Sequence, residues 1–141
     1  MTRSSVSYAA AALTVAGALW VAACKSSTGN NCGSGTPPSL VGSYSLESYT
    51  LGTTTITSPT ASGTLQFRTT MYNVNLSLPG PETVVDSGTY TIVGSSCINE
   101  LSQAGNPTFS GTFQLNLADS TFRVTGTAAG QVAASIWKKT S

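Results

Sequence analysis

The sequence predicts an all-β protein whose folded part is an antiparallel, eight-stranded, up-and-down β-barrel. From Leu40 onward, apolar residues recur at every second position, a pattern typical of strands with one buried and one solvated face. Turn-forming residues interrupt these runs at short intervals. Lys, Glu and Arg, which favour helices, are scarce, because all charged residues together make up only 8% of the chain.

The alternation is clearest at residues 71–78, where polar residues separate Tyr72, Val74 and Leu76. Eight strands are predicted, at residues 40–50, 53–58, 62–68, 71–78, 86–94, 108–117, 121–127 and 131–138. Residues 95–107 are expected to form a long irregular connection. A meander of this size tends to close, because closure removes unpaired strand edges. Eight strands enclose an interior that side chains can fill or that one small ligand can occupy.

Residues 1–23 have the composition of a secretory signal peptide. Arg3 is their only charged residue, and the stretch 9–23 is apolar apart from Thr14. This stretch is shorter than the roughly 20 residues that a membrane-spanning helix needs. A basic start, a short apolar run and small residues at its end predict export and cleavage.

The segment Val21-Ala22-Ala23-Cys24 resembles the lipobox of bacterial lipoproteins. The resemblance implies that the signal is cut between Ala23 and Cys24, and that Cys24 carries acyl chains such as palmitate. Each buried methylene contributes about 0.8 kcal/mol, so these chains would act as a membrane anchor. The alternative is an ordinary signal cut nearby, with Cys24 as a free or disulfide-bonded thiol.

A lipid anchor would place the protein in the cell envelope. Lys25 and Ser26 follow the cysteine, so the aspartate that retains some lipoproteins at an inner membrane is missing, which favours the outer membrane. Residues 24–39 are predicted to comprise the lipidated cysteine and a flexible linker, because Ser, Gly, Thr, Asn and Pro dominate them.

Cys32 and Cys97 are the other two cysteines of the chain. Outside the cytoplasm an even remainder favours a disulfide, which would contribute about 3–4 kcal/mol in the chain-entropy model. Such a bond would leave only residues 25–31 as a free tether. The alternative is two unpaired thiols.

Residues 40–141 are predicted to be one barrel domain, and several of its segments resemble the lipocalin-like domains of bacterial lipoproteins. These segments are LVGSYSL at 40–46, SGTLQF at 62–67, DSGTYTI at 86–92 and IWKK at 136–139. Tyr44 stands where that family usually has a tryptophan that plugs the closed end. The resemblance implies that Tyr44 is the plug, provided that its hydroxyl group finds a partner.

Six aromatic residues are candidates for the barrel plug or for the lining of a cavity. They are Tyr44, Phe67, Tyr72, Tyr90, Phe113 and Phe122. We favour core packing for them, because a small barrel needs inward-facing aromatic rings whether or not it binds anything. Trp137 is expected at the rim or as an ordinary residue of the last strand. Arg68 and Arg123 are expected to point outward.

No catalytic, cofactor or metal site is predicted. The chain has no histidine, which removes the commonest general base and the commonest metal ligand. Glu82 and Asp86 are expected to form a solvated face of the loop around Pro79-Gly80-Pro81. With six Lys and Arg against five Asp and Glu, the chain lacks the basic charge of a nucleic-acid binder.

Two functions remain open, and we expect neither to be enzymatic. The lipocalin-like resemblance implies a lipid-anchored, monomeric barrel that binds a small hydrophobic ligand. The alternative is a structural or interaction domain with a filled core that contacts another envelope protein. An apolar internal cavity of about 300 Å³ or more would favour the first function, whereas an interior filled by side chains would contradict ligand carriage inside the barrel. An exposed apolar patch would favour the second function.

Overall fold

The computed structural model describes residues 32–80, 82–106, 108–128 and 130–141. The predicted signal peptide, the lipidation site Cys24 and linker residues 25–31 lie outside this part of the chain. Within it, all regular secondary structure is β-strand. The described residues include no helix with the length and apolar character needed to cross a membrane.

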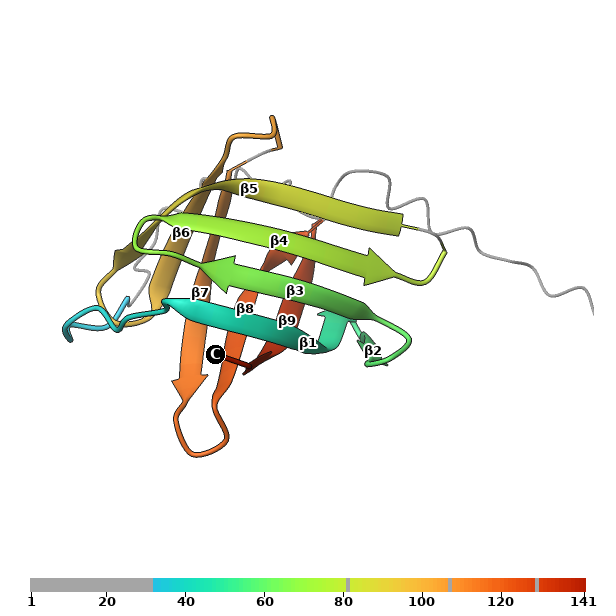
Figure 1. Ribbon diagram of the computed structural model, residues 1–141, viewed down its shortest axis with the longest axis horizontal. Helices are drawn as coiled ribbons and strands as arrows, with labels where there is room; N and C mark the ends of the chain where they lie inside the picture. Colours follow the sequence, from blue (N-terminus) through green and yellow to red (C-terminus); the bar gives the residue numbers. More distant parts are fainter. Residues whose placement is uncertain (1–31, 81, 107, 129) are drawn as a thin grey trace, which may run out of the picture.

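Nine strands follow one another along the described chain. They are β1 (Gly42–Leu51), β2 (Thr54–Thr57), β3 (Ser62–Phe67), β4 (Met71–Leu78), β5 (Glu82–Val93), β6 (Cys97–Ser102), β7 (Phe109–Asn116), β8 (Thr121–Ala128) and β9 (Gln131–Lys139). All pairings are antiparallel, and β9 returns to pair with β1. Strands β1 and β3 to β9 therefore close into an eight-stranded barrel, with β2 as an additional strand (Figure 1). The predicted fold class is confirmed, and the lipocalin-like architecture fits it.

The prediction that residues 95–107 form one long irregular connection was wrong. Strand β6 lies within that segment and pairs with β5 through Ile92 and Ile98, and with β7 through Cys97 and Thr112. The sequence pattern concealed this strand because two of its inward-facing residues, Glu100 and Ser102, are polar. Backbone ladder hydrogen bonds form regardless of which side chains face inward, so the strand is regular although its alternation is not apolar.

The predicted strand at residues 53–58 exists in part, but it is not one of the eight barrel strands. β2 pairs only with the second half of β1, for example Tyr49 with Ile56, whereas β3 pairs with the first half, for example Ser45 with Thr64. Both therefore lie along the same edge of β1. The β1–β2 hairpin extends the barrel wall at one end (Figure 1).

The prediction of a solvated loop at Glu82 and Asp86 was also wrong, because β5 begins at Glu82 and not near residue 86. Along this strand Val84, Asp86 and Tyr90 are on the inner face. Asp86 is only 2% exposed. An acid thus occupies a position where the alternation of the strand predicts an apolar core residue.

Aromatic rings fill one end of the barrel, which we call the plugged end. The ring centroids of Tyr44, Phe67, Tyr90 and Phe122 lie 4.8–6.1 Å from at least one neighbour of the group. Leu40 is fully buried beside them, and its carbonyl oxygen accepts a hydrogen bond of 2.7 Å from the Tyr44 hydroxyl group. Tyr44 therefore has the partner that a buried tyrosine plug requires.

A disulfide joins Cys32 to Cys97 at the start of β6. The backbone N–H groups of Ser95 and Ser96 both donate to the carbonyl oxygen of Cys32, at 2.7 and 3.0 Å. Gly94 has a φ of +59°, and a Cβ there would lie 2.2 Å from the same oxygen. The predicted linker is therefore attached to the plugged end of the barrel from Cys32 onward.

Candidate binding site

The open end of the barrel holds a pocket of about 720 Å³, which we call the mouth pocket. It lies where the β1–β2, β4–β5 and β8–β9 turns approach one another. Leu51, Ile56, Leu78 and Val132 supply much of its lining, and Glu82 is the one charged residue among its described lining residues. Strand β2 contributes Ile56, so the additional hairpin deepens this end of the barrel.

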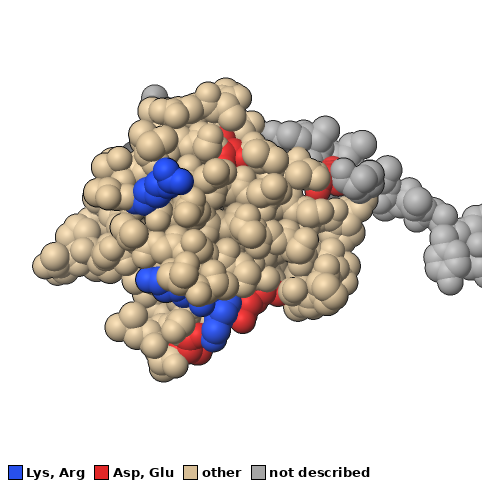
Figure 2. All heavy atoms as spheres, in the orientation of Figure 1, with Lys and Arg blue, Asp and Glu red and all other residues tan. Residues whose placement is uncertain are grey.

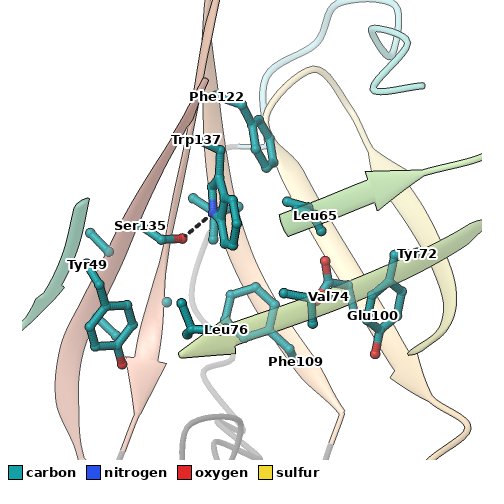
Figure 3. A pocket seen from close by; sticks show the side chains of 14 residues that line it. Tyr49, Leu65, Tyr72, Val74, Leu76, Glu100, Phe109, Phe122, Ser135 and Trp137 are labelled. Atoms are coloured by element: carbon teal, nitrogen blue, oxygen red, sulfur yellow. Dashed lines mark hydrogen bonds between the residues drawn. The ribbon is translucent and has the colours of Figure 1, made fainter. Parts of the chain in front are cut away.

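A second, much smaller space of about 50 Å³, the inner cavity, shares Tyr49 with the mouth pocket and Phe122 with the plug. Figure 3 shows the side chains that line it. Leu76, Phe109 and Trp137 are among its mostly apolar walls, and Glu100 is the one charged residue in the described lining. A water molecule needs about 10–15 Å³ of such volume, so the inner cavity can hold only a few water-sized groups. The interior therefore does not reach the size of about 300 Å³ expected for ligand carriage.

Tyr49 borders both the mouth pocket and the inner cavity. Its side chain is 8% exposed, and its buried hydroxyl group has no hydrogen-bond partner among the described residues. Burial, together with the nearby charge of Glu82, raises the pKa of Tyr49 to about 12. The hydroxyl group therefore keeps its proton, and leaving such a group unpaired costs about 1–3 kcal/mol.

On the other side of the inner cavity in Figure 3, Tyr72 points toward the interior of the barrel. Its hydroxyl group donates a hydrogen bond of 2.6 Å to Asp86. Asp86 also accepts bonds from the Ser87 backbone N–H at 2.9 Å and from the Ser102 hydroxyl group at 2.5 Å. Three donors stabilise the charged form of a carboxyl group. Burial, followed by the bond to Asp86, raises the pKa of Tyr72, so the phenol remains the donor.

Glu100 is 4% exposed and lines the inner cavity. Burial, and secondarily the negative charge of Asp86, raises the pKa of Glu100 to about 8. No side chain or backbone group of the described chain forms a hydrogen bond with its carboxyl group. At neutral pH Glu100 is therefore mainly a neutral acid, whose donor and acceptor atoms are both unpaired.

Sequence reasoning did not select Glu100 or Tyr49. Glu100 lies in the segment expected to be irregular, and a single acid in an irregular loop reads as a solvated residue. Its position in the repeat Ile98, Glu100, Ser102 was the available signal, since these residues share one face once the segment is read as a strand. Tyr49 follows a bulge between Leu46 and Ser48, which shifts the alternation by one residue.

The six predicted aromatic residues are all buried. Tyr44, Phe67, Tyr90 and Phe113 belong to the plugged end, Tyr72 lines the inner cavity, and Phe122 contacts both groups.

Of the two alternatives for Trp137, the structure bears out a residue of the last strand, β9, and not a contact at the rim. Trp137 lies inside the barrel and is 4% exposed, because its Nε1–H donates 2.8 Å to the Ser135 hydroxyl group and so does not need the solvent. Arg68 and Arg123 are exposed, as predicted.

The described residues contain no group of three His, Cys, Asp or Glu side chains that could hold a metal ion. A closed antiparallel barrel with one plugged end and one open, pocketed end has room for a small ligand at its open end. Comparisons of this chain with protein-family models, with curated proteins and with solved structures found no match.

Proposed function

We propose that the protein is a lipoprotein of the cell envelope, anchored through acyl chains on Cys24, whose barrel binds a small apolar molecule at its open end. The mouth pocket carries this proposal. Its volume of about 720 Å³ falls within the range of roughly 300–1,000 Å³ typical of small-molecule sites. The inner cavity is too small for that role, so binding is assigned to the mouth and not to the centre of the barrel.

The apolar lining of the mouth pocket supplies a driving force for binding. Leu51, Ile56 and Leu78 are only partly buried, and Val132 is 60% exposed. Covering such surface is favourable by about 25 cal/mol for each Å² of apolar area removed from water. A molecule with an apolar body therefore gains free energy by entering this end of the barrel.

The described chain begins at the end of the barrel opposite to the mouth. Cys32 is the first described residue after the predicted tether, and it is bonded to Cys97 at the plugged end. The mouth pocket lies at the opposite end, where β2 and the β4–β5 turn are located (Figure 1). With an anchor on Cys24, the mouth is the end of the barrel farther from the attachment of the tether.

A second candidate function is a structural or interaction domain with an envelope protein as partner. The small inner cavity favours it, because most of the interior is filled by side chains. The outer wall also carries exposed apolar residues, with Met71 and Leu101 on either side of Thr89 on neighbouring strands. The face shown in Figure 2 carries few charged side chains, which is compatible with a protein contact there.

Native mass spectrometry of the full chain purified from its own host tests the first function. We expect a co-purifying small molecule, which an Ile56→Asp variant loses because the new charge lies in the mouth pocket. A Leu117→Asp variant is the matched control, since Leu117 is 87% exposed at the β7–β8 turn near the plugged end. Equal ligand occupancy in both variants, or an empty wild-type protein, contradicts binding at the mouth.

A further inference from the structure

Two buried polar groups beside the inner cavity lack hydrogen-bond partners within the described chain. One is the hydroxyl group of Tyr49, which is fully buried. The other is the carboxyl group of Glu100, whose side chain is 4% exposed and lines the inner cavity. Elsewhere in the interior, the polar groups are paired: Asp86 has three donors, and Trp137 donates to Ser135. Buried polar groups are nearly always hydrogen-bonded, so this pair points to an occupant that the protein chain itself does not provide.

We infer that the inner cavity and the mouth pocket together bind an amphipathic amine, with its ammonium head against the carboxylate of Glu100 and its apolar body in the mouth. The inference rests on the proposed function, since it requires that the mouth accept an apolar molecule. It adds the chemistry of the head group, which the mouth pocket alone does not define.

The sizes of the two spaces match the two parts of such a ligand. A cavity of about 50 Å³ accepts a group the size of a few water molecules, as an ammonium head is, but not an apolar body. The mouth pocket of about 720 Å³ accommodates the body. Tyr49 lines both spaces. A ligand that fills both would therefore lie against the Tyr49 side chain.

The charges of the interior select a cation. Asp86 and Glu100 are the buried charged residues of the described chain, and Glu82 is the charged residue of the described mouth lining. An anionic head would be repelled by the nearby charge of Asp86 and, once it is ionised, by Glu100, and in a medium of low dielectric constant that repulsion is strong. Because Asp86 already accepts three hydrogen bonds, Glu100 is the carboxyl group that remains available for a new ion pair.

Aromatic rings around the inner cavity favour the same head group. Phe109, Phe122 and Trp137 contribute to its walls together with Tyr49 and Tyr72. The negative face of an aromatic ring attracts a desolvated cation, and tryptophan does so most strongly. A neutral alcohol of the same shape would gain neither this attraction nor the ion pair.

Binding should also release a proton. Glu100 has a pKa of about 8, so pairing with an ammonium ion below that pH requires the carboxyl group to lose its proton to the solvent. Facing it are Asp86 and Tyr90 on β5, Tyr72 on β4 and Tyr49 on β1. The three tyrosines have raised pKa values and stay neutral. Glu100 is therefore the group whose ionisation limits amine binding between about pH 6 and 8.

Isothermal titration calorimetry on the full chain tests the inference with phenethylamine and its neutral counterpart, phenylethanol. At about pH 7.5 we expect the amine to bind at least about tenfold more tightly than the alcohol, which corresponds to one ion pair of modest strength. Equal affinities overturn the amine assignment and leave the proposed function intact. Absence of binding by either compound overturns both.

A pair of variants locates the effect. Glu100→Gln removes the ionisable group at nearly constant size, and it should reduce amine affinity about tenfold while leaving phenylethanol binding unchanged. Glu47→Gln makes the same change at an exposed position of β1, and it should alter neither affinity. Unchanged amine binding by Glu100→Gln overturns the inference.

If Glu100→Gln does not fold, the pH dependence of amine affinity in the wild-type protein tests the inference instead. Below the pKa of Glu100, amine affinity should rise about tenfold for each pH unit, because one proton is released per ligand bound. A flat profile between about pH 6 and 7.5 overturns the inference.

Discussion

Asp86 and Glu100 point into the barrel from neighbouring strands, β5 and β6, and hydrogen-bond donors reach only Asp86. The negative charge of Asp86 adds to the effect of burial in raising the pKa of Glu100 to about 8. The carboxyl group of Asp86 is thus satisfied by three hydrogen bonds, while burial favours the neutral form of Glu100. Because of this difference, Glu100 is the group whose ionisation should make stability and ligand binding depend on pH.

We expect Glu100→Gln to remove a fall in stability that the wild-type protein shows between about pH 4.5 and 8. The pKa of Glu100 is raised from 4.5 to about 8 by folding, so its contribution is fully present below pH 4.5 and is lost as pH rises through 8. Between about pH 5 and 9 the wild-type free energy of unfolding should decrease by a few kcal/mol more than that of the variant. Urea unfolding at both pH values measures this, and parallel pH profiles of the two proteins would contradict it.

Loss of the hydroxyl group should affect the free energy of unfolding differently at the two tyrosines of β1, Tyr44 and Tyr49. Tyr44→Phe leaves the buried carbonyl oxygen of Leu40 without its donor and should lower the free energy of unfolding by about 1–2 kcal/mol. Tyr49→Phe removes a hydroxyl group that has no partner, so it should be neutral or stabilising in the unliganded protein. Thermal or urea unfolding of both variants makes the comparison. A larger loss in Tyr49→Phe than in Tyr44→Phe would show that the plug assignment is wrong.

Replacing both Cys32 and Cys97 by serine should destabilise the barrel. The bond spans 65 residues of sequence, and the chain-entropy model assigns a loop of that length about 4 kcal/mol. Under oxidising conditions the variant should therefore unfold at a much lower temperature or urea concentration than the wild-type protein. Treatment with a reducing agent should lower the unfolding midpoint of the wild-type protein to near that of the variant. Native thiol labelling of both cysteines in the untreated wild-type protein would rule the bond out.

Cys24→Ser should release the protein from membranes, because the proposed acyl chains would have no attachment site. Fractionation of cells into membrane and aqueous material measures the effect. Cys32→Ser is the control, since it removes a cysteine but not the proposed anchor, and it should remain with the membranes. Unchanged membrane association of Cys24→Ser would refute the lipid anchor.

Much of the barrel was readable from the sequence. Residues 71–78 and 121–127 were placed on strands by alternation alone, and strands β4 and β8 match them within a residue. These segments were readable because each inward position carries an apolar residue or glycine, so the chemistry of the side chains reports the face on which they lie. The count of eight barrel strands was also correct, although β6 takes the place in the barrel that the prediction gave to residues 53–58.

The site could not be read in this way. Glu100 and Ser102 occupy inward positions of β6, and Asp86 occupies an inward position of β5, so polar residues interrupt the pattern where the fold is regular. Functional positions are expected where the residue type disagrees with the alternation of apolar and polar residues along the strand. Strand pairing overrides the pattern because it is made by backbone groups, which every residue possesses.

By itself the sequence determined the fold class, because local periodicity reports it, and the expectation of export, because composition reports it. The expectations of a Tyr44 plug and of a lipid anchor on Cys24 came from resemblances to known families. The tertiary structure alone decided which strands close the barrel, that β2 extends its open end, and that Glu100 lies unpaired in the inner cavity. These depend on which distant segments become neighbours. Hydrogen bonds between strands determine which segments become neighbours when the barrel closes. The residue pattern within a single strand does not predict those pairings.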